Sequence, residues 1–496
     1  MLYISTRGSD EKLISAEAIV KGLSDDGGLY VPEYFPRITL DIINMLTTKT
    51  YSQRASYILS AYMGDFSTEE IEDFANRAYN IDAFSDPAIA PLHTLDDSTY
   101  FLELWHGPTS AFKDYALQIM PSLLTASLRK INENREVCIL VATSGDTGKA
   151  ALEGFRDVPG TRIMVFYPRD GVSEVQKLQM TSQQGSNVNV VAVDGNFDDT
   201  QTGVKEIFSD ELLREKLSEQ GFFLSSANSI NWGRLVPQIA YYVSAYCDLL
   251  DQSRITLGEK INFCVPTGNF GNILAAYYAH KMGLPIGKLI LASNRNDVLA
   301  DFVKTGIYDR NRQFHLTVSP SMDILVSSNL ERLLFELSGK DGEMITGLMT
   351  ALSQEGKYEI PLAMKAELDR IFVAGSCSEE DTLETIARTF SENAYLIDTH
   401  TAVAYKVLRE YRENTGDNTN CVVVSTASPF KFCESVLFAL GKSVQGEGPE
   451  LIDILSEHTD IGVPKPLQGL LEKTPRFIES ISAERMQSSV REFLRS

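Results

Sequence analysis

The chain has 496 residues, too many for one simple core, so we expect two or three domains. Its 67 acidic residues outnumber its 45 basic ones and give a formal net charge of −22, which argues against nucleic acid or an anionic membrane as a partner. The apolar content of 43% is ordinary for a water-soluble globular protein, and no apolar run approaches the roughly 20 residues needed to cross a bilayer.

Residues 1–88 are predicted to form an N-terminal, mainly helical domain. Helical patterns occupy 17–22 and 51–59, and a glycine-containing turn leads into an extended segment at 26–32. The proline-containing stretch 86–91 is expected to end this domain.

Beyond this boundary the pattern changes to alternating strands and helices. Apolar runs rich in β-branched residues predict strands at 137–142, 162–167 and 188–193, with a helix after each. Strands that are apolar on both faces and separated by helices are typical of a parallel sheet covered on both sides. We therefore predict a small α/β domain over residues 137–234.

Three strands of the same kind are predicted in the rest of the chain, at 261–265, 288–292 and 421–426. We assign them to a large α/β domain formed by residues 89–136 together with 235–496. The predicted fold class is α/β, with two parallel-sheet domains and a helical N-terminal domain. No role is assigned to residues 436–496.

The cysteines and histidines show no metal or disulfide pattern. The six cysteines are scattered without a CxxC pair, and the six histidines have no HxH or HExxH spacing. The first residues lack the basic and apolar regions of a signal peptide. We therefore expect reduced cysteines, a cytoplasmic location and no metal site.

A polar turn at 143–149 follows the first strand of the small domain. Ser144, Asp146 and Thr147 stand where a helix begins, and hydroxyl and backbone N–H groups gathered at a helix N-terminus can bind an anion. A nucleotide-binding P-loop is rejected because Gly145 and Gly148 are too close together for that motif. The alternative is an ordinary capped helix start.

Two further polar turns follow strands of the large domain. In the segment 268–272, Gly-Asn-Phe-Gly-Asn, glycine and asparagine tolerate positive φ, so successive N–H groups can point inward and hold a phosphate. A simple strand-to-helix turn is the alternative. Thr426 ends the last buried strand, where a hydroxyl usually serves as a satisfied cap.

Lys113 lies in a segment where a positive charge is poorly placed. Gly107-Pro108 predicts a turn, Thr109 or Ser110 can cap a helix, and Lys113 then falls in or near its first turn. The helix dipole and the neighbouring Phe112 both disfavour the ammonium form and lower the amine pKa. A neutral amine is what a carbonyl compound needs to form a Schiff base, although a solvated surface lysine is the common alternative.

These motifs, together and in this order, resemble the threonine synthase family, in its longer class found in bacteria and fungi. The segments 3–8, 26–29 and 228–234 are also similar, so the resemblance extends from residue 3 to about 435. It implies a pyridoxal 5′-phosphate (PLP) enzyme with the tryptophan-synthase-β-like fold, fold type II. The reaction implied is the conversion of O-phospho-L-homoserine and water to L-threonine and phosphate, the last step of threonine biosynthesis.

The resemblance also implies roles for single residues. Lys113 matches the Schiff-base lysine, which would also shuttle protons, and Thr426 matches the hydroxyl facing the pyridine nitrogen. The loop around the cofactor phosphate is matched by Gly268, Asn269, Phe270, Gly271 and Asn272, and the loop that meets the substrate carboxylate by Ser144, Gly145, Asp146 and Thr147. Ser428 departs from the family, where many relatives are expected to have a histidine.

The substrate phosphate needs donors inside this acidic protein. Lys149 and Arg234 are the cationic candidates and Asn231 is a neutral one; arginine is favoured because its planar fork fits phosphate. For both cations a solvated surface charge is the alternative, and His400 is interpreted as a structural cap.

Two other functions remain open. A phospholyase on the same scaffold would release a 2-oxo acid and phosphate. A nucleotide- or phosphate-binding protein without a covalent cofactor would be colourless. Monomer and homodimer are both compatible with the sequence.

Overall fold

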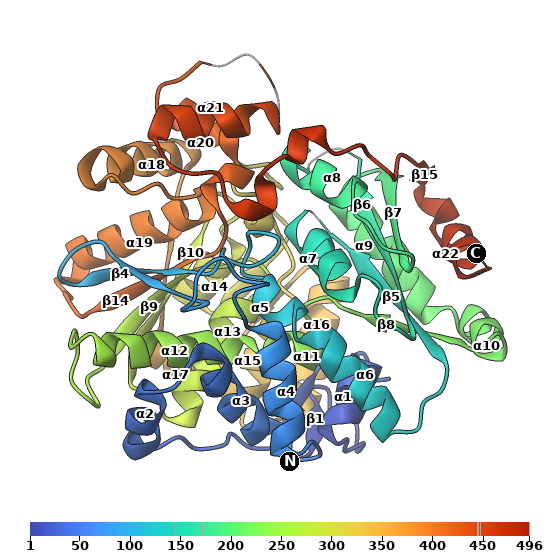
Figure 1. The fold of residues 1–496 in the computed structure, drawn as a ribbon. Coiled ribbons are helices and arrows are strands. Elements are labelled where there is room, and N and C mark those ends of the chain that lie inside the picture. Colours follow the sequence, from blue (N-terminus) through green and yellow to red (C-terminus); the bar gives the residue numbers. More distant parts are fainter. Residues whose placement is uncertain (144, 170–171, 444–445, 447, 496) are drawn as a thin grey trace.

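The computed structural model describes residues 1–143, 145–169, 172–443, 446 and 448–495 (Figure 1). Within these residues, none of the helices combines the length and apolar character that crossing a membrane requires. All six cysteines are buried and free, as expected.

The N-terminal segment is mainly helical. A two-stranded antiparallel sheet pairs β1 (Tyr3–Ser5) with β2 (Tyr30–Pro32). The helices are α1 (Ser15–Lys21), α2 (Leu40–Thr47), α3 (Tyr51–Tyr62) and α4 (Thr68–Ala78), so the helices predicted at 17–22 and 51–59 are confirmed. Thr50 and Ser67 begin α3 and α4 with capping boxes, which satisfy N–H groups that the first helical turn leaves free.

The smaller sheet has five parallel strands in the order β15-β7-β6-β5-β8. They are β5 (Glu136–Ala142), β6 (Thr161–Pro168), β7 (Val188–Asp194), β8 (Phe222–Ser226) and β15 (Ser480–Ser482). The three strands predicted here are confirmed as β5, β6 and β7. Helices α7 (Asp146–Phe155), α8 (Glu174–Thr181), α9 (Phe197–Ser209) and α10 (Glu211–Glu219) connect the strands.

The C-terminal tail returns to this smaller sheet. It crosses from α21 (Glu450–Thr459) to β15, which pairs with β7, and ends in α22 (Met486–Arg495) against α9 (Figure 1). The predicted division assigned residues 480–495 to the large domain, whereas they lie with the sheet of segment 137–234.

The larger sheet has six strands in the order β13-β10-β9-β14-β4-β3. They are β3 (Leu92–Thr94), β4 (Thr99–Glu103), β9 (Ile261–Pro266), β10 (Ile286–Ser293), β13 (Phe372–Ser376) and β14 (Cys421–Ser425). The sheet is parallel, as predicted, except at one edge, where β3 runs antiparallel to β4. Only residues 95–98 join these two strands, which is too short for a parallel crossover.

The remaining elements surround the two sheets. Before β9 come α5 (Asp114–Leu117), α6 (Met120–Lys130), α11 (Trp232–Leu235) and α12 (Gln238–Asp251). After it come α13 (Gly271–Met282), α14 (Val298–Thr305), β11 (Ile307–Asp309), α15 (Leu330–Leu337), α16 (Gly342–Gln354), β12 (Lys357–Glu359), α17 (Leu362–Ile371), α18 (Glu379–Asn393), α19 (Thr399–Thr415), the 3₁₀ turn η2 (Pro429–Lys431) and α20 (Cys433–Ala439). One apolar core joins the N-terminal helices to both sheets, so the carboxyl ends of β5, β9 and β14 are held around a common space.

Candidate active site

A cavity of about 1290 Å³ lies where the carboxyl ends of these strands meet. Its walls come from the N-terminal segment, the smaller sheet and the larger sheet. The predicted residues that line it are Lys113, Asp146, Thr147, Gly268, Asn269, Phe270, Gly271, Asn272, Thr426 and Arg234. Ser144 lies outside the described residues.

Lys113 is almost buried, with only 11% of its side chain exposed. It occupies the N-cap position of α5, as expected, and its Nζ lies 4.4 Å from the centroid of the Phe112 ring and 3.6 Å from Asp146 Oδ2. Burial lowers the pKa of the amine; Asp146 opposes this effect, whereas nearby cations reinforce it. The cavity therefore shifts the amine towards its neutral form.

The predicted cap of α5 is not formed. Thr109 donates its N–H and hydroxyl to the Asp114 carboxylate, at 2.9 and 2.7 Å. Ser110 adopts a left-handed φ of 58°, and its buried hydroxyl has no partner among the described residues. This hydroxyl is a free polar group in the loop that carries Lys113.

Asp146 is held by a second lysine that the sequence analysis missed. Lys431, on η2, is fully buried; its Nζ lies 2.5 Å from Asp146 Oδ1 and donates to the Thr109 carbonyl at 2.9 Å. Burial would raise the pKa of Asp146, but Lys431 and then Lys113 hold it far below its usual range. The available signal was a charged residue inside the otherwise apolar run Pro429–Cys433.

The loop between β9 and α13 presents several donors without acceptors. Phe270 adopts a left-handed φ of 63°, and no acceptor for the backbone N–H groups of 269–272 is found in the described parts of the chain. Gly268 must lack a side chain, because a Cβ there would lie 2.6 Å from the Ser321 carbonyl oxygen. These N–H groups stand at the positive end of the α13 dipole and suit a phosphate group.

Asn272 adds a side-chain donor to this loop. Its Oδ1 accepts from the hydroxyls of Tyr241 and Tyr242 at 2.7 and 2.6 Å. The opposite end of the amide, Nδ2, is buried and has no partner among the described residues. The two tyrosines therefore fix the amide with its donor free.

Thr426 lies directly beyond β14, beside the lysine segment. Its carbonyl accepts from the Phe112 N–H at 2.9 Å, and Ala111 forms an isolated bridge with Ala427. Ser428 has a structural role, since its hydroxyl accepts from the Phe430 N–H at 3.3 Å and caps η2.

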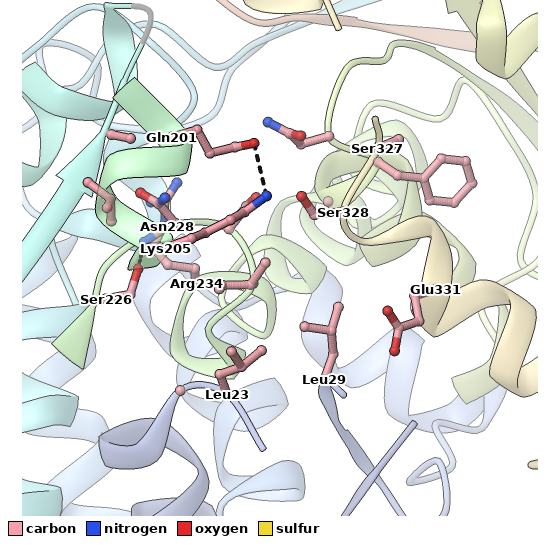
Figure 2. A pocket seen from close by; sticks show the side chains of 18 of the residues that line it. Leu23, Leu29, Gln201, Lys205, Ser226, Asn228, Arg234, Ser327, Ser328 and Glu331 are labelled. Carbon is pink, nitrogen blue, oxygen red and sulfur yellow. Dashed lines mark hydrogen bonds between the residues drawn. The ribbon is translucent and has the colours of Figure 1, made fainter. Parts of the chain in front are cut away.

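Arg234 is a buried cation in the cavity wall, without a carboxylate partner in the described structure (Figure 2). Its Nη1 donates to the Ala227 carbonyl, whereas Nε is buried without an acceptor among the described residues. Burial lowers the pKa of Arg234 to about 10. The edge formed by Nε and Nη2 is the one with which Arg7 binds Glu331, by two bonds of 3.0 and 2.9 Å. Arg234 can therefore bind an anion in the same way.

Two predicted phosphate ligands do not line the cavity. Lys149 Nζ pairs with Glu153 at 2.8 Å and donates to Gln183 at 2.5 Å. Asn231 is buried and caps α11, with its Nδ2 donating to the Ile19 and Ser226 carbonyls at 2.9 and 3.1 Å. Both side chains are used in local structure.

His400 lines the cavity but both of its ring nitrogens are occupied. Nδ1 lies 2.9 Å from Asp398 Oδ1, and Nε2 accepts from the Ser321 N–H at 3.2 Å. The helix cap itself is Asp398, which accepts from the N–H groups of residues 400 and 401. The prediction that His400 is the cap is therefore wrong, and its ring instead bonds Asp398 and the Ser321 N–H.

Further polar residues in the cavity wall were not predicted. Figure 2 shows Lys205 and Gln201, on α9, facing Ser327 and Ser328 on the opposite wall. Lys205 Nζ donates to Gln201 Oε1 at 3.4 Å. Their position depends on the packing of α9 against the rest of the cavity, for which the sequence gives no local signal.

Three family models match the chain. Residues 2–79 match "Threonine synthase N terminus", residues 86–427 match "Pyridoxal-phosphate dependent enzyme", and residues 401–492 match "Threonine synthase, C-terminal". Together they span the N-terminal helices, both sheets and the C-terminal tail.

Individual proteins of known name are similar over most of the chain. The threonine synthase of Pseudomonas aeruginosa is 41% identical over 452 residues, which cover 91% of this chain and 92% of that protein. Threonine synthase-like 1 of Homo sapiens is 40% identical over 95% of this chain, and the match spans 65% of that longer protein, slightly less than two thirds.

Solved structures are similar over the whole chain. The PLP-bound threonine synthase from Brucella melitensis has a TM-score of 0.87 at 37% identity, with 100% of both chains covered. The threonine synthase from yeast has the same TM-score at 32% identity, covering 100% of this chain and 99% of the yeast chain. The chain therefore belongs to the threonine synthase family of pyridoxal-phosphate-dependent enzymes.

Proposed function

We propose that the chain is a threonine synthase that converts O-phospho-L-homoserine and water to L-threonine and phosphate, as the last step of threonine biosynthesis. One observation carries the proposal. The cavity contains a buried amine, Lys113, and two separate sets of unpaired donors, the loop 268–272 and the free edge of Arg234. Two such sets suit a reaction in which cofactor and substrate each bear a phosphate.

The residues present fit PLP. The unpaired N–H groups of 269–272 and the free Asn272 Nδ2 would hold its phosphate, Lys113 its carbonyl carbon and Thr426 its ring nitrogen. When bound, the cofactor takes up the negative charge that develops on the substrate as protons leave. Thr426 offers a neutral hydroxyl, which does not hold a proton on a ring nitrogen as a carboxylate would, and this disfavours transamination.

Lys113 serves as the base. Because burial lowers the pKa of this amine, the neutral form in which Nζ can accept the proton of the substrate Cα is reached at a lower pH than for a solvent-exposed lysine. The same amine is placed to move the Cβ proton before phosphate leaves Cγ and to assist the addition of water at Cβ.

Arg234 is the proposed ligand of the substrate phosphate. Its free Nε and Nη2 groups offer two parallel donors, and Nη1 anchors the guanidinium to the Ala227 carbonyl. The segment that meets the substrate carboxylate is still proposed to contain Ser144, Asp146 and Thr147. Asp146 would not bind the carboxylate itself but would hold Lys113 and Lys431 through its ion pairs. Lys149 and Asn231 are not proposed as ligands, because neither side chain lines the cavity.

The wider arrangement is also part of the proposal. We assign the chain the tryptophan-synthase-β-like arrangement, fold type II, with an N-terminal domain of 1–88, a small domain of 137–234 joined by the tail 480–495, and a large domain from the rest. A cytoplasmic monomer or homodimer remains the expectation.

Product analysis tests the function. Purified protein with PLP and O-phospho-L-homoserine should release phosphate and L-threonine in equal amounts, and Lys113→Ala should release neither. Release of 2-oxobutyrate and ammonia instead of threonine would indicate a phospholyase. If the protein is colourless and the Lys113→Ala variant binds phosphate as well as the parent does, the chain is a binding protein without a covalent cofactor.

A further inference from the structure

Lys431 is a fully buried lysine without a place in the mechanism above. It lies on η2, behind Asp146 as seen from Lys113, and contacts two parts of the site. One contact is the ion pair with Asp146 Oδ1 at 2.5 Å, and the other is the bond to the Thr109 carbonyl at 2.9 Å. Thr109 begins the short loop that leads to Lys113, so Lys431 connects that loop to α7.

Asp146 lies between two lysines but is not shared equally. Its Oδ1 is 2.5 Å from Lys431 Nζ, whereas its Oδ2 is 3.6 Å from Lys113 Nζ. Gln176 donates a further bond to Oδ1 at 2.7 Å. The carboxylate is therefore neutralised mainly by Lys431, although Lys113 is the lysine that faces the cavity.

The other charges near Lys113 favour the same assignment. The charged groups that act on its amine are Asp146 from α7, Lys431 from η2 and Arg234 from α11. Asp114, on the helix of Lys113 itself, is bonded to Thr109, and burial raises its pKa to about 6. With Asp146 paired to Lys431 and Asp114 bonded to Thr109, neither of these carboxylates depends on a positive charge on Lys113.

We propose that Lys431 is a positioning residue: its buried ion pair satisfies Asp146, so this carboxylate does not draw a proton onto Lys113. Without Lys431, Asp146 would retain Lys113 as its nearest cation, and a buried carboxylate strongly favours the charged form of a neighbouring amine. Removing Asp146 as well would remove this demand. The inference rests on the proposed function only in taking Lys113 as the reactive amine.

The test measures the protonation of Lys113 directly. The full-length, cofactor-free protein is labelled with an amine-acylating reagent over a range of pH, and the peptide containing Lys113 is quantified by mass spectrometry. Lys431→Met should raise the apparent pKa of Lys113 by about one unit or more, so that the whole labelling profile moves to higher pH by that amount. The double variant Lys431→Met/Asp146→Asn should return it to within about half a unit of the parent, since both charges are gone.

Lys149→Met is the matched control, because it removes another buried lysine that is ion-paired on α7 and does not line the cavity. It should leave the labelling profile of Lys113 unchanged. The proposal is overturned if Lys431→Met leaves the profile unchanged, or if the double variant is shifted as far as the single one. If Lys431→Met does not fold, Asp146→Asn alone decides: labelling of Lys113 must increase, and an unchanged or lower rate refutes the proposal. Since labelling needs no turnover, a failure of the proposed reaction is seen separately in the product analysis.

Discussion

Replacing Arg234 with methionine separates a functional from a structural role for this residue. Arg234 is 3% exposed, and its guanidinium makes one hydrogen bond within the described residues, to the Ala227 carbonyl. A buried charge with so few partners lowers the stability of the fold, so a structural role does not account for Arg234. We therefore expect the variant to lose activity and to keep most of its stability.

The size of the loss follows from the free edge of the guanidinium. Two charge-assisted bonds, from Nε and Nη2, at about 1.5 kcal/mol each amount to about 3 kcal/mol of substrate binding. Since 1.4 kcal/mol is a factor of ten, kcat/KM should fall about 150-fold, mainly through KM. The free energy of unfolding should fall by no more than about 1.5 kcal/mol, the value of the lost charge-assisted bond to Ala227.

The assay combines steady-state phosphate release with unfolding in urea. Arg332→Met is the matched control: Arg332 is also fully buried with a pKa lowered to about 10, but it donates to the Tyr30 carbonyl, the Asn329 side chain and the Ile230 carbonyl. Its loss should cost at least about 3 kcal/mol of stability, because it leaves buried acceptors unpaired. An Arg234→Met variant with unchanged KM and a similar loss of stability would refute the assignment.

Three further predictions concern neighbouring residues. Because the pKa of Lys113 is lowered by burial and deprotonation generates the base, kcat should rise with pH along a limb below the ordinary lysine value of about 10.4; a limb at or above that value in the pH–rate profile would contradict this. Asn231→Ala should lose about 2 kcal/mol in urea unfolding, since its cap and two carbonyl contacts are removed, yet leave KM within about twofold, and a large rise in KM would restore it as a ligand. Asn272→Asp places a carboxylate where the free Nδ2 now lies, so titration with PLP should show at least about tenfold weaker binding, and unchanged affinity would exclude this loop as the phosphate site.

The main strands could be predicted because local composition alone indicates that they are buried. The runs at 137–142, 162–167 and 188–193 are mostly apolar, as strands buried on both faces are, and each forms a strand of the smaller sheet. β15 has three residues, Ser480–Ser482, with only the middle one buried, and it pairs with β7 almost 300 residues earlier. Such a short strand is stabilised by its distant partner, so its own composition does not identify it.

The site could be predicted where a residue has no local partner. Among the described residues, Lys113 has no carboxylate partner nearby in sequence, and Arg234 uses only Nη1 on a local carbonyl, that of Ala227, whereas Lys149 finds Glu153 one turn later on the same helix. Asn231 likewise turns to the carbonyl of Ser226, five residues earlier. Lys431 was missed because its partner, Asp146, lies on α7, almost 300 residues earlier in the chain. Residue type and spacing thus indicate which polar side chains lie at the ends of strands, and only packing decides which of them face the ligand.

The state of the Lys113 amine is tested most directly by borohydride. Protein purified with PLP should absorb in the visible range, and reduction should bleach this absorbance and fix one cofactor covalently per chain. Mass spectrometry should then find the added group on the peptide that contains Lys113, and Lys113→Ala should carry none. A protein that remains colourless with PLP, or that carries the reduced cofactor on another lysine, would contradict the assignment of Lys113 as the reactive amine.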